Sequence, residues 1–410
     1  MLRVDAARLR ADFEALSAIG GTEGGGVSRP SFSDAHLAAR EWFLERGSVA
    51  GLEAKVDAAG NHSLLLRSGK PDAPTLLLGS HLDSVPNGGR FDGALGVVAS
   101  LEVLRRLQDE ALDLPVTLEA IDFTDEEGTL VGLLGSLALA GRLAPESLAF
   151  PRGGREALRA GLARAGLKET SLANARRDPS SLTGYLELHV EQGPMLERER
   201  VDVGLVTGIV GSRSFFLTFV GTASHAGTTP MDARRDAAVA AARFVVAARE
   251  LVVQTYSGCV MTVGDITVEP GSFNVVPGRA RVAVEFRSVD DTQLDRLETA
   301  LLDLAKAQAL EVEVEPVGRW EPTALDPTMR AALARAADRL GLSTMELASG
   351  AGHDAQALAA VTRSGMAFVP SRGGISHAPE ERTAWEDCVN GADVLLGATL
   401  DLAGFSGLES

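Results

Sequence analysis

Cysteine is scarce in this chain, where Cys259 and Cys388 are the only two among 410 residues. A disulfide framework and a thiolate metal cluster are therefore excluded, and a cytoplasmic setting is favoured. Any metal ion that the protein binds must be held by histidine and carboxylate side chains.

Long uncharged apolar runs are also missing. No segment reaches the roughly 18–20 apolar residues that a membrane span requires, and the N-terminal MLRVDAARLRADFEALSAIG carries charges where a signal peptide would be apolar. No repeat of fixed period is visible. We therefore expect no membrane partner and no solenoid architecture.

Positive charge is in deficit. The chain has 39 lysine and arginine residues against 56 aspartate and glutamate residues, which gives a formal net charge of −17. Because such a chain repels the phosphate backbone, nucleic acid is not an expected partner. Hydrophobic residues make up 45% and charged residues 23%, which is typical of a packed globular protein, and the length corresponds to about two to four domains.

The order of apolar patterns predicts an α/β domain interrupted by a second domain. Apolar runs at 75–80 and 116–123 predict strands, and the pattern at 94–110 predicts a helix between them, as in a parallel sheet. Residues 212–320 follow a βαββαβ order instead, which predicts an antiparallel sheet with two helices on one face. The expected boundaries are 1–207 with 325–410 for the split domain and 208–324 for the inserted one.

Histidines gather at the ends of predicted strands. Five of the seven lie there in polar, glycine-bearing segments: His81, His189, His225, His353 and His377. A lone loop histidine is usually a structural residue, whereas five in matching contexts favour a site. Ligands of parallel α/β sheets bind beyond the carboxyl ends of the strands, so we expect chemistry at this edge.

The segment after the first of these strands offers carboxylates beside a histidine. His81 and Asp83 are two residues apart, so on an extended backbone their side chains leave the same face and Asp83 is placed to hold the imidazole. Asp92 has two equal interpretations from the residues alone. It is either a metal ligand or the cap of the helix that follows it.

Adjacent carboxylates follow the second strand. Glu126 and Glu127 point in different directions, so one can bind a metal ion while the other faces the substrate; a solvated acidic turn is the alternative. With the histidines they form a set of three imidazoles and two carboxylates that suits two zinc, manganese, cobalt or nickel ions. That set is His81, Asp92, Glu127, His189 and His377.

Seven segments between about residue 55 and residue 381 resemble the dinuclear metal amidohydrolases of the aminoacylase and glutamate carboxypeptidase superfamily. They are HLDSVPNGGRFDGALGV, DEEG, LELHVEQGPMLE, GTASHAGTTPMDARRDA, PGSFNVVPG, GAGHDA and GGISHAPEE. The residues of these segments and their order along the chain are similar to those of the hydantoinase/carbamoylase branch. The resemblance implies a zinc-peptidase-like catalytic domain with a mostly parallel sheet, and an inserted α+β domain that serves as lid and dimerisation domain.

The resemblance also implies roles for individual residues. His81 and His189 would bind one metal ion, Glu127 and His377 the other, and Asp92 would bridge two divalent ions, zinc foremost. Glu126 is the implied general base, with Asp83 and His225 as further catalytic residues. The implied substrate contacts are Gln192, His225, Asn274, Arg287 and His353.

The activity that the resemblance implies is hydrolysis of the linear ureido C–N bond of an N-carbamoyl-L-amino acid, a small carboxylate-bearing substrate. Allantoate or N-carbamoyl-β-alanine hydrolysis, aminoacylase or dipeptidase activity, and a non-catalytic binding protein are the alternatives. A homodimer is implied, with 212–221 as an exposed sheet edge or the helix at 231–252 in its interface. One departure concerns the substrate: family members often continue the double glutamate with Ser-Arg-Phe, whereas this chain has Gly128, Thr129 and Leu130.

Overall fold

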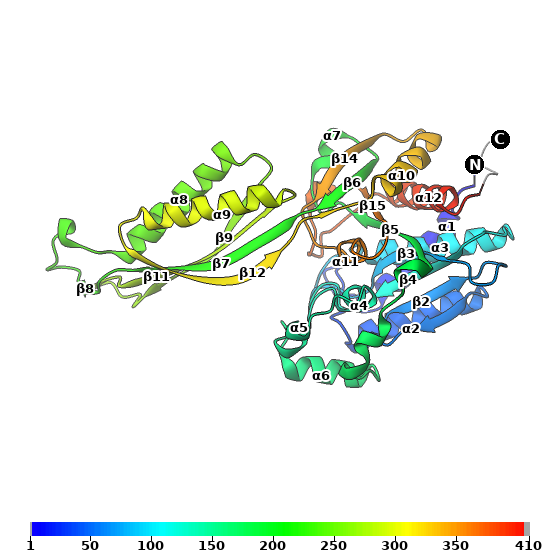
Figure 1. The fold of residues 1–410 in the computed structure, drawn as a ribbon, viewed down its shortest axis with the longest axis horizontal. Helices are drawn as coiled ribbons and strands as arrows, with labels where there is room; N and C mark the ends of the chain where they lie inside the picture. Colours follow the sequence, from blue (N-terminus) through cyan, green and yellow to red (C-terminus); the bar gives the residue numbers. More distant parts are fainter. Residues whose placement is uncertain (1, 406–410) are drawn as a thin grey trace. The chain divides into compact units, whose positions relative to one another are not determined.

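The computed structural model describes residues 2–405 (Figure 1). The chain divides into two compact units, one made of the residues up to Thr207 together with those from Leu325 onward, and one made of Gly208–Ala324. No helix of the described part is both long and apolar enough to cross a lipid bilayer.

A nine-stranded sheet forms the centre of the first unit, with the order β1-β2-β4-β3-β5-β15-β6-β13 and β14 paired to β6. The four central strands run parallel to one another: β4 (Thr117–Phe123), β3 (Thr75–His81), β5 (Leu182–Val190) and β15 (Ser364–Val369). The flanking strands are β1 (Glu53–Val56), β2 (His62–Leu66), β6 (Val203–Ile209), β13 (Thr323–Ala324) and β14 (Thr344–Ser349). The expected mostly parallel α/β sheet is confirmed.

Helices of the first unit surround this sheet. They are α1 (Ala6–Ala18), α2 (Asp34–Val49), α3 (Ala94–Asp109), α4 (Leu134–Leu139), α5 (Pro145–Ala149), α6 (Arg155–Arg164), α7 (Met195–Glu199), α10 (Pro327–Leu340), α11 (Asp354–Leu358) and α12 (Trp385–Leu402). α1, α3, α10 and α12 share one core with the central strands, and a smaller core lies around α4 and α6.

The central strands are hydrophobic along nearly their whole length because both faces of the sheet are covered there. Nearly every residue of β3, β4, β5 and β15 is buried, as expected for strands that are covered on both faces. α3 is the crossover that returns the chain from β3 to β4. Because these strands run in one direction, their carboxyl ends meet at one edge of the sheet, and the polar segments that follow them lie together.

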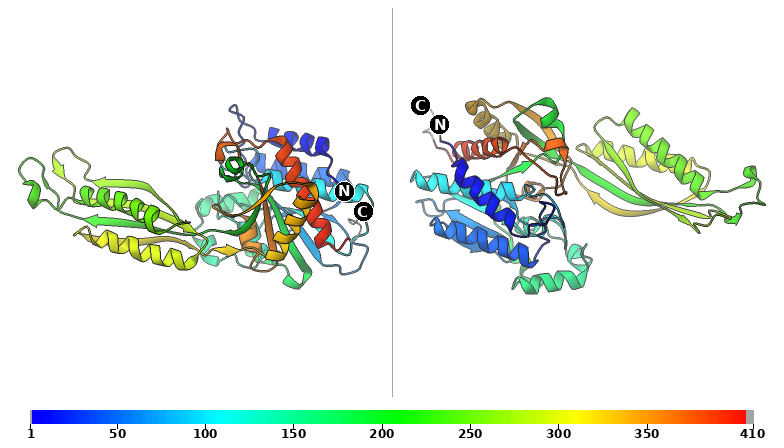
Figure 2. Two further views of the ribbon diagram at one scale, coloured as in Figure 1. Left: turned by 90° about the horizontal axis from the view of Figure 1, so that it is seen from above. Right: turned by 180° about the vertical axis from the view of Figure 1, so that it is seen from behind.

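The second unit has a four-stranded antiparallel sheet with helices α8 (Ala237–Thr255) and α9 (Asp291–Lys306) on one face (Figure 2). Its strands are β7 (Gly211–Val220), β9 (Val260–Glu269), β11 (Arg279–Ser288) and β12 (Glu311–Trp320), and a short pair, β8 (Ser224–His225) and β10 (Val275–Val276), lies outside this sheet. The expected βαββαβ order is present. The core contains Phe219 of β7, Phe244 of α8 and Leu297 of α9.

Two details of this unit differ from expectation. The prediction that 212–221 forms an exposed sheet edge is wrong, because β7 lies between β12 and β11 in the order β12-β7-β11-β9. In a βαββαβ chain the later strands add on both sides of the first one, and chain order does not reveal this. The helix expected at 231–252 begins at Ala237, because Asp236 accepts hydrogen bonds from the backbone of its first turn.

Candidate metal centre

The candidate metal centre lies at the carboxyl edge of the parallel strands. His81 is the last residue of β3, Glu126 and Glu127 follow β4, His189 lies near the end of β5, and His377 follows β15. The register of these strands therefore brings together residues that are almost 300 positions apart.

Asp92 lies at the middle of the cluster. Its Oδ1 is 3.2 Å from His189 Nε2 and 3.5 Å from His81 Nε2, and its Oδ2 is 3.2 Å from His377 Nε2. Glu127 Oε2 is 3.4 Å from the same His377 nitrogen. The donors form two groups that share Asp92, namely His81–Asp92–His189 and Asp92–Glu127–His377.

Asp92 does not cap the helix that it precedes. The capping residue of α3 is Gly93, and no side chain bonds to the first turn. Gly93 has φ +64°, and a Cβ there would lie 2.5 Å from the His81 ring, so the bend before α3 requires glycine for both conformation and space. The backbone is shaped to bring Asp92 to the imidazoles.

The imidazole hydrogen bonds show that this donor set suits a cation. His81 Nδ1 lies 3.0 Å from the carbonyl oxygen of Asp83, and His189 Nδ1 lies 2.9 Å from that of Val190. Because a carbonyl only accepts, each Nδ1 carries the hydrogen, and Nε2 of the neutral ring presents a lone pair. These lone pairs face carboxylate oxygens, an arrangement that a positive charge between them stabilises.

The remaining features of the donor set agree with a divalent ion. The buried Glu127 Oε1 has no hydrogen-bond partner among the described residues, and nitrogen and oxygen donors from histidine and carboxylates are those that zinc and similar ions accept. The side chains of Glu126 and Glu127 are only 10% and 6% exposed. The alternative of a solvated acidic turn is therefore wrong.

Bound protons compensate the negative charge of the carboxylates in this cluster when no metal ion is bound. Burial lowers the pKa of His81, but the charge of Glu126 and a hydrogen bond to Asp92 outweigh it and hold that pKa well above its usual value. The hydrogen bond to Asp92 raises the pKa of His377 to about 9. Burial raises the pKa of Glu127 to about 7. Metal ions and protons must therefore compete for the same donors.

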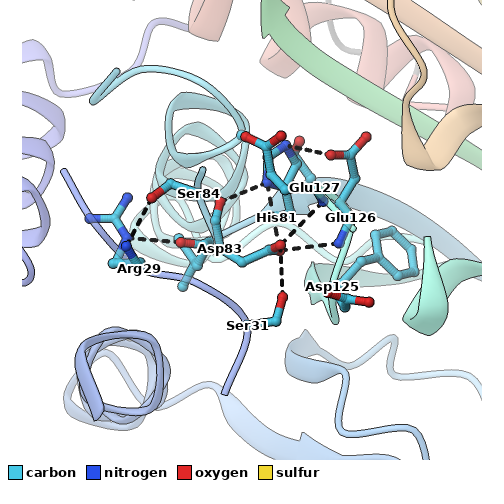
Figure 3. Close-up of polar contacts among 12 residues, drawn as sticks. Arg29, Ser31, His81, Asp83, Ser84, Asp125, Glu126 and Glu127 are labelled. Carbon is cyan, nitrogen blue, oxygen red and sulfur yellow. Dashed lines mark hydrogen bonds and ion pairs between the residues drawn. The ribbon is translucent and has the colours of Figure 1, made fainter. Parts of the chain in front are cut away.

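Asp83 supports the double-glutamate segment through hydrogen bonds to its backbone (Figure 3). Its carboxylate accepts the backbone N–H groups of Glu126 and Glu127, both at 3.2 Å, and the hydroxyl of Ser31 at 2.9 Å. The same carboxylate lies 3.8 Å from His81 Nδ1. The expectation that the Asp83 side chain holds the imidazole needs correction, since His81 Nδ1 donates its hydrogen bond to the backbone carbonyl of Asp83.

Glu126 lies beside the first group of donors. Its Oε2 is 3.5 Å from His81 Nε2, and its backbone N–H is held by Asp83. Burial raises the pKa of Glu126 well above its usual value. A carboxylate with a raised pKa next to donors of this kind is suited to accept a proton and to release it again.

Gln192 and His353 also lie at this edge of the sheet. Gln192 donates through Nε2 to Asp92 Oδ2 at 2.8 Å, while its buried Oε1 has no hydrogen-bond partner within residues 2–405. The His353 ring lies 4.6 Å from that of His189, centroid to centroid, and its Nε2 is 2.8 Å from Ser349 Oγ. Burial lowers the pKa of His353 well below its usual value, so this ring is neutral.

The other predicted substrate residues belong to the second unit. His225 of β8 pairs with Val275 of β10, and the carbonyl of Asn274 accepts the N–H of Ala226 at 2.9 Å, so His225 and Asn274 lie in neighbouring segments. The His225 side chain is exposed. Arg287 of β11 donates through Nε to Glu285 at 2.9 Å.

Some residues of the site were not foreseen. Ser31, Ser376 and Glu381 bind the backbone or side chains that carry the ligands. Glu381 lies in the segment GGISHAPEE, four positions after His377, and this spacing was the available signal. No sequence pattern links Ser31 to Asp83, because the contact depends on the tertiary fold.

Comparison with known proteins agrees with this geometry. Residues 77–401 match the peptidase family M20/M25/M40. The chain is 38% identical to an N-carbamoyl-L-amino-acid amidohydrolase of Paenarthrobacter aurescens, over 96% of this chain and 97% of that protein. It is 32% identical to an allantoate amidohydrolase of Bacillus subtilis, over 90% of this chain and 91% of the other.

A solved structure extends the likeness to the whole fold. An amidase of the hydantoinase/carbamoylase family from Burkholderia multivorans superposes with a TM-score of 0.89 at 36% identity, covering 98% of both chains. The protein belongs to the M20 family of metallohydrolases. Within that family it is a member of the hydantoinase/carbamoylase branch, whose enzymes hydrolyse linear amides.

We expect the affinity of the metal-free protein for Zn²⁺ to fall as the pH is lowered from about 9 to about 6. The pKa values of His377 and Glu127, about 9 and about 7, mean that a lower pH places more protons on the second donor group, and each must leave when an ion binds. Calorimetric titration in buffers of different ionisation enthalpy measures the protons released. An affinity that does not change over this pH range would contradict the assigned donors.

Proposed function

We propose that the protein hydrolyses the linear ureido C–N bond of an N-carbamoyl-L-amino acid and releases the amino acid, carbon dioxide and ammonia. The observation that carries this proposal is the pair of donor groups that share Asp92, with Glu126 beside them. The full-length likeness to an N-carbamoyl-L-amino-acid amidohydrolase supports the choice of substrate. The two free cysteines are in keeping with a cytoplasmic enzyme.

Two divalent ions are proposed at this centre, zinc foremost. His81 and His189 would hold one ion, Glu127 and His377 the other, and Asp92 would contribute an oxygen to each. When bound, such ions supply Lewis acidity toward the ureido carbonyl and lower the pKa of a shared water.

Glu126 is the proposed general base. Its buried carboxylate takes a proton from the attacking water and then delivers that proton to the leaving nitrogen, a transfer for which a raised pKa is suited. The Asp83 carboxylate keeps Glu126 in place through the backbone N–H of that residue. Gln192 Oε1, which is buried and lacks a hydrogen-bond partner in the described part of the chain, is proposed to accept a substrate N–H.

Substrate recognition is assigned to His353 and to residues of the second unit. His225 is proposed to donate a hydrogen bond to the developing oxyanion. Arg287 can grip a carboxylate through two parallel hydrogen bonds, with the neutral amide of Asn274 as a further contact. Nε and Nη2 of Arg287 already contact Glu285 Oε1, so a substrate carboxylate that binds this edge of the guanidinium competes with Glu285.

Allantoate hydrolysis is the second candidate. The 32% identity to an allantoate amidohydrolase is close to the identity with the carbamoylase relative. In addition, Gly128, Thr129 and Leu130 replace the residues that are frequent after the double glutamate. The metal donors do not discriminate between these substrates, because the bond that reacts is the same.

A homodimer formed through the second unit is also proposed. Along α8, Val239, Val246 and Val253 form an apolar stripe with exposed fractions of 45%, 59% and 70%. The sheet edges are β9 and β12, whose outer backbone groups can pair with another chain. In this dimer His225 completes the active site of the partner subunit.

The substrate assignment predicts ammonia release from N-carbamoyl-L-amino acids. We expect the highest kcat/KM for these compounds in a panel that also contains N-carbamoyl-β-alanine, allantoate and dipeptides. Measured ammonia and amino acid should appear in equal amounts. Preferential cleavage of dipeptides without ammonia would contradict the ureido substrate, and preference for allantoate would favour the second candidate.

Glu126→Gln tests the general base. The variant keeps the shape of the side chain but loses the carboxylate, so kcat should fall by about 10²–10⁴-fold while the metal content is retained. Glu127→Gln is the matched control: it changes a metal donor, and we expect loss of metal as well as activity. Steady-state kinetics and elemental analysis measure both quantities. Full activity of Glu126→Gln would refute the assignment.

Mixed dimers test whether His225 acts on the partner subunit. Glu126→Gln and His225→Ala chains should each be inactive alone. After subunit exchange, a heterodimer should regain about one working site, built from the intact Glu126 of one chain and the intact His225 of the other. A purified heterodimer without recovered activity would show that His225 does not act on the partner.

A further inference from the structure

Glu381 is a fully buried carboxylate at the metal centre, outside both donor groups. Its Oε1 accepts the backbone N–H of Phe91 at 2.8 Å and that of Asp92 at 3.1 Å. Its Oε2 accepts the hydroxyl of Ser376 at 2.8 Å. All three donors are uncharged, so the visible role of this carboxylate is to hold two segments by hydrogen bonds.

The two segments carry different metal donors. One contains Asp92, which both donor groups share, and the other contains His377, which directly follows Ser376. Ser376 Oγ also lies 3.3 Å from Asp92 Oδ2. Glu381 therefore connects the backbone of the shared carboxylate to the segment of the imidazole that faces it.

The glycine at position 89 makes room for the Glu381 carboxylate. A Cβ on Gly89 would lie 2.1 Å from the carboxyl carbon of Glu381, so any larger residue at position 89 would displace it. Burial raises the pKa of Glu381, and the nearby charge of Asp92 raises it further. Placing two buried carboxylates so close together is unfavourable in itself, and bound cations in this region offset that cost.

We propose that Glu381 is a positioning residue that holds Asp92 against His377 and thereby sets the occupancy of the second ion, the one assigned to Asp92, Glu127 and His377. This inference rests on the proposed two-ion centre. The first ion depends less on Glu381, because His81 and His189 lie on β3 and β5, which the sheet holds in place. The effect of removing Glu381 should therefore be unequal between the two ions.

Two substitutions of Glu381 distinguish the effect of its hydrogen bonds from the effect of its charge. Glu381→Ala leaves the N–H groups of Phe91 and Asp92 without their acceptor. Glu381→Gln removes the charge but keeps one oxygen for these N–H groups, and its NH₂ can donate to Ser376 Oγ. If Glu381 acts through hydrogen bonds, Gln should restore most of what Ala loses. Glu380, the adjacent exposed glutamate, supplies the control variant Glu380→Ala.

The experiment is a titration of the chelator-treated protein with Co²⁺, followed by visible absorbance and by calorimetry. For Glu381→Ala we expect the first ion to bind as in the parent and the second to bind about 10–100-fold more weakly, the usual effect of losing a residue that orients a ligand. Glu381→Gln should stay within a few-fold of the parent. Glu380→Ala should match the parent for both ions.

Three results would overturn the proposal. These are unchanged affinity for both ions in Glu381→Ala, an equal loss at both sites, and a Glu381→Gln variant as impaired as Glu381→Ala. Should Glu381→Ala fail to fold, Ser376→Ala removes one of the three hydrogen bonds to Glu381, together with the Ser376 contacts to Asp92 and Gln192. This variant should still weaken the second ion selectively, and equal loss or no loss would again refute the role. A parent protein that binds fewer than two ions would instead refute the two-ion centre of the proposed function.

Discussion

One carboxylate facing three imidazoles is the interaction on which the candidate metal centre of the first unit depends. Asp92 lies within 3.5 Å of His81, His189 and His377. Since the Nδ1 hydrogens of His81 and His189 are used by backbone carbonyls, their Nε2 lone pairs face an anion. Such a cluster is stable only with positive charge inside it, supplied by protons or by metal ions.

The residues around this cluster hold the carboxylates and imidazoles close together. Asp83 holds the backbone of the double glutamate, and Glu381 holds that of Asp92. Gly89 and Gly93 provide the space in which the Glu381 carboxylate and the His81 ring fit. Because hydrogen bonds fix the backbone of Asp92, Glu126 and Glu127, these residues keep their arrangement without a bound ion, which lowers the reorganisation that metal binding requires.

The second unit has a different character. Its core lies between one sheet and two helices. The polar residues assigned to substrate recognition lie in or next to the short β8–β10 strand pair and on β11. His225 is exposed, and Arg287 is bound to Glu285. The candidate metal donors thus gather at the carboxyl ends of the buried parallel strands, whereas His225 and Arg287, which are proposed for substrate recognition, are exposed and half-buried, respectively.

Hydrophobic periodicity and the spacing of metal-binding and reactive side chains are local properties. The sequence alone therefore predicted the α/β class, the βαββαβ order of the second unit and the family. It also placed His81, Glu127 and His189 at strand ends, where parallel strands had to bring them together. The residues alone left Asp92 open between ligand and helix cap, while the family resemblance made it the bridging ligand, and the prediction for 212–221 misplaced β7 at a sheet edge. The tertiary structure shows that Asp92 does not cap α3, places β7 inside its sheet and reveals the contacts of Ser31 and Glu381, because these features depend on contacts between segments distant in the chain.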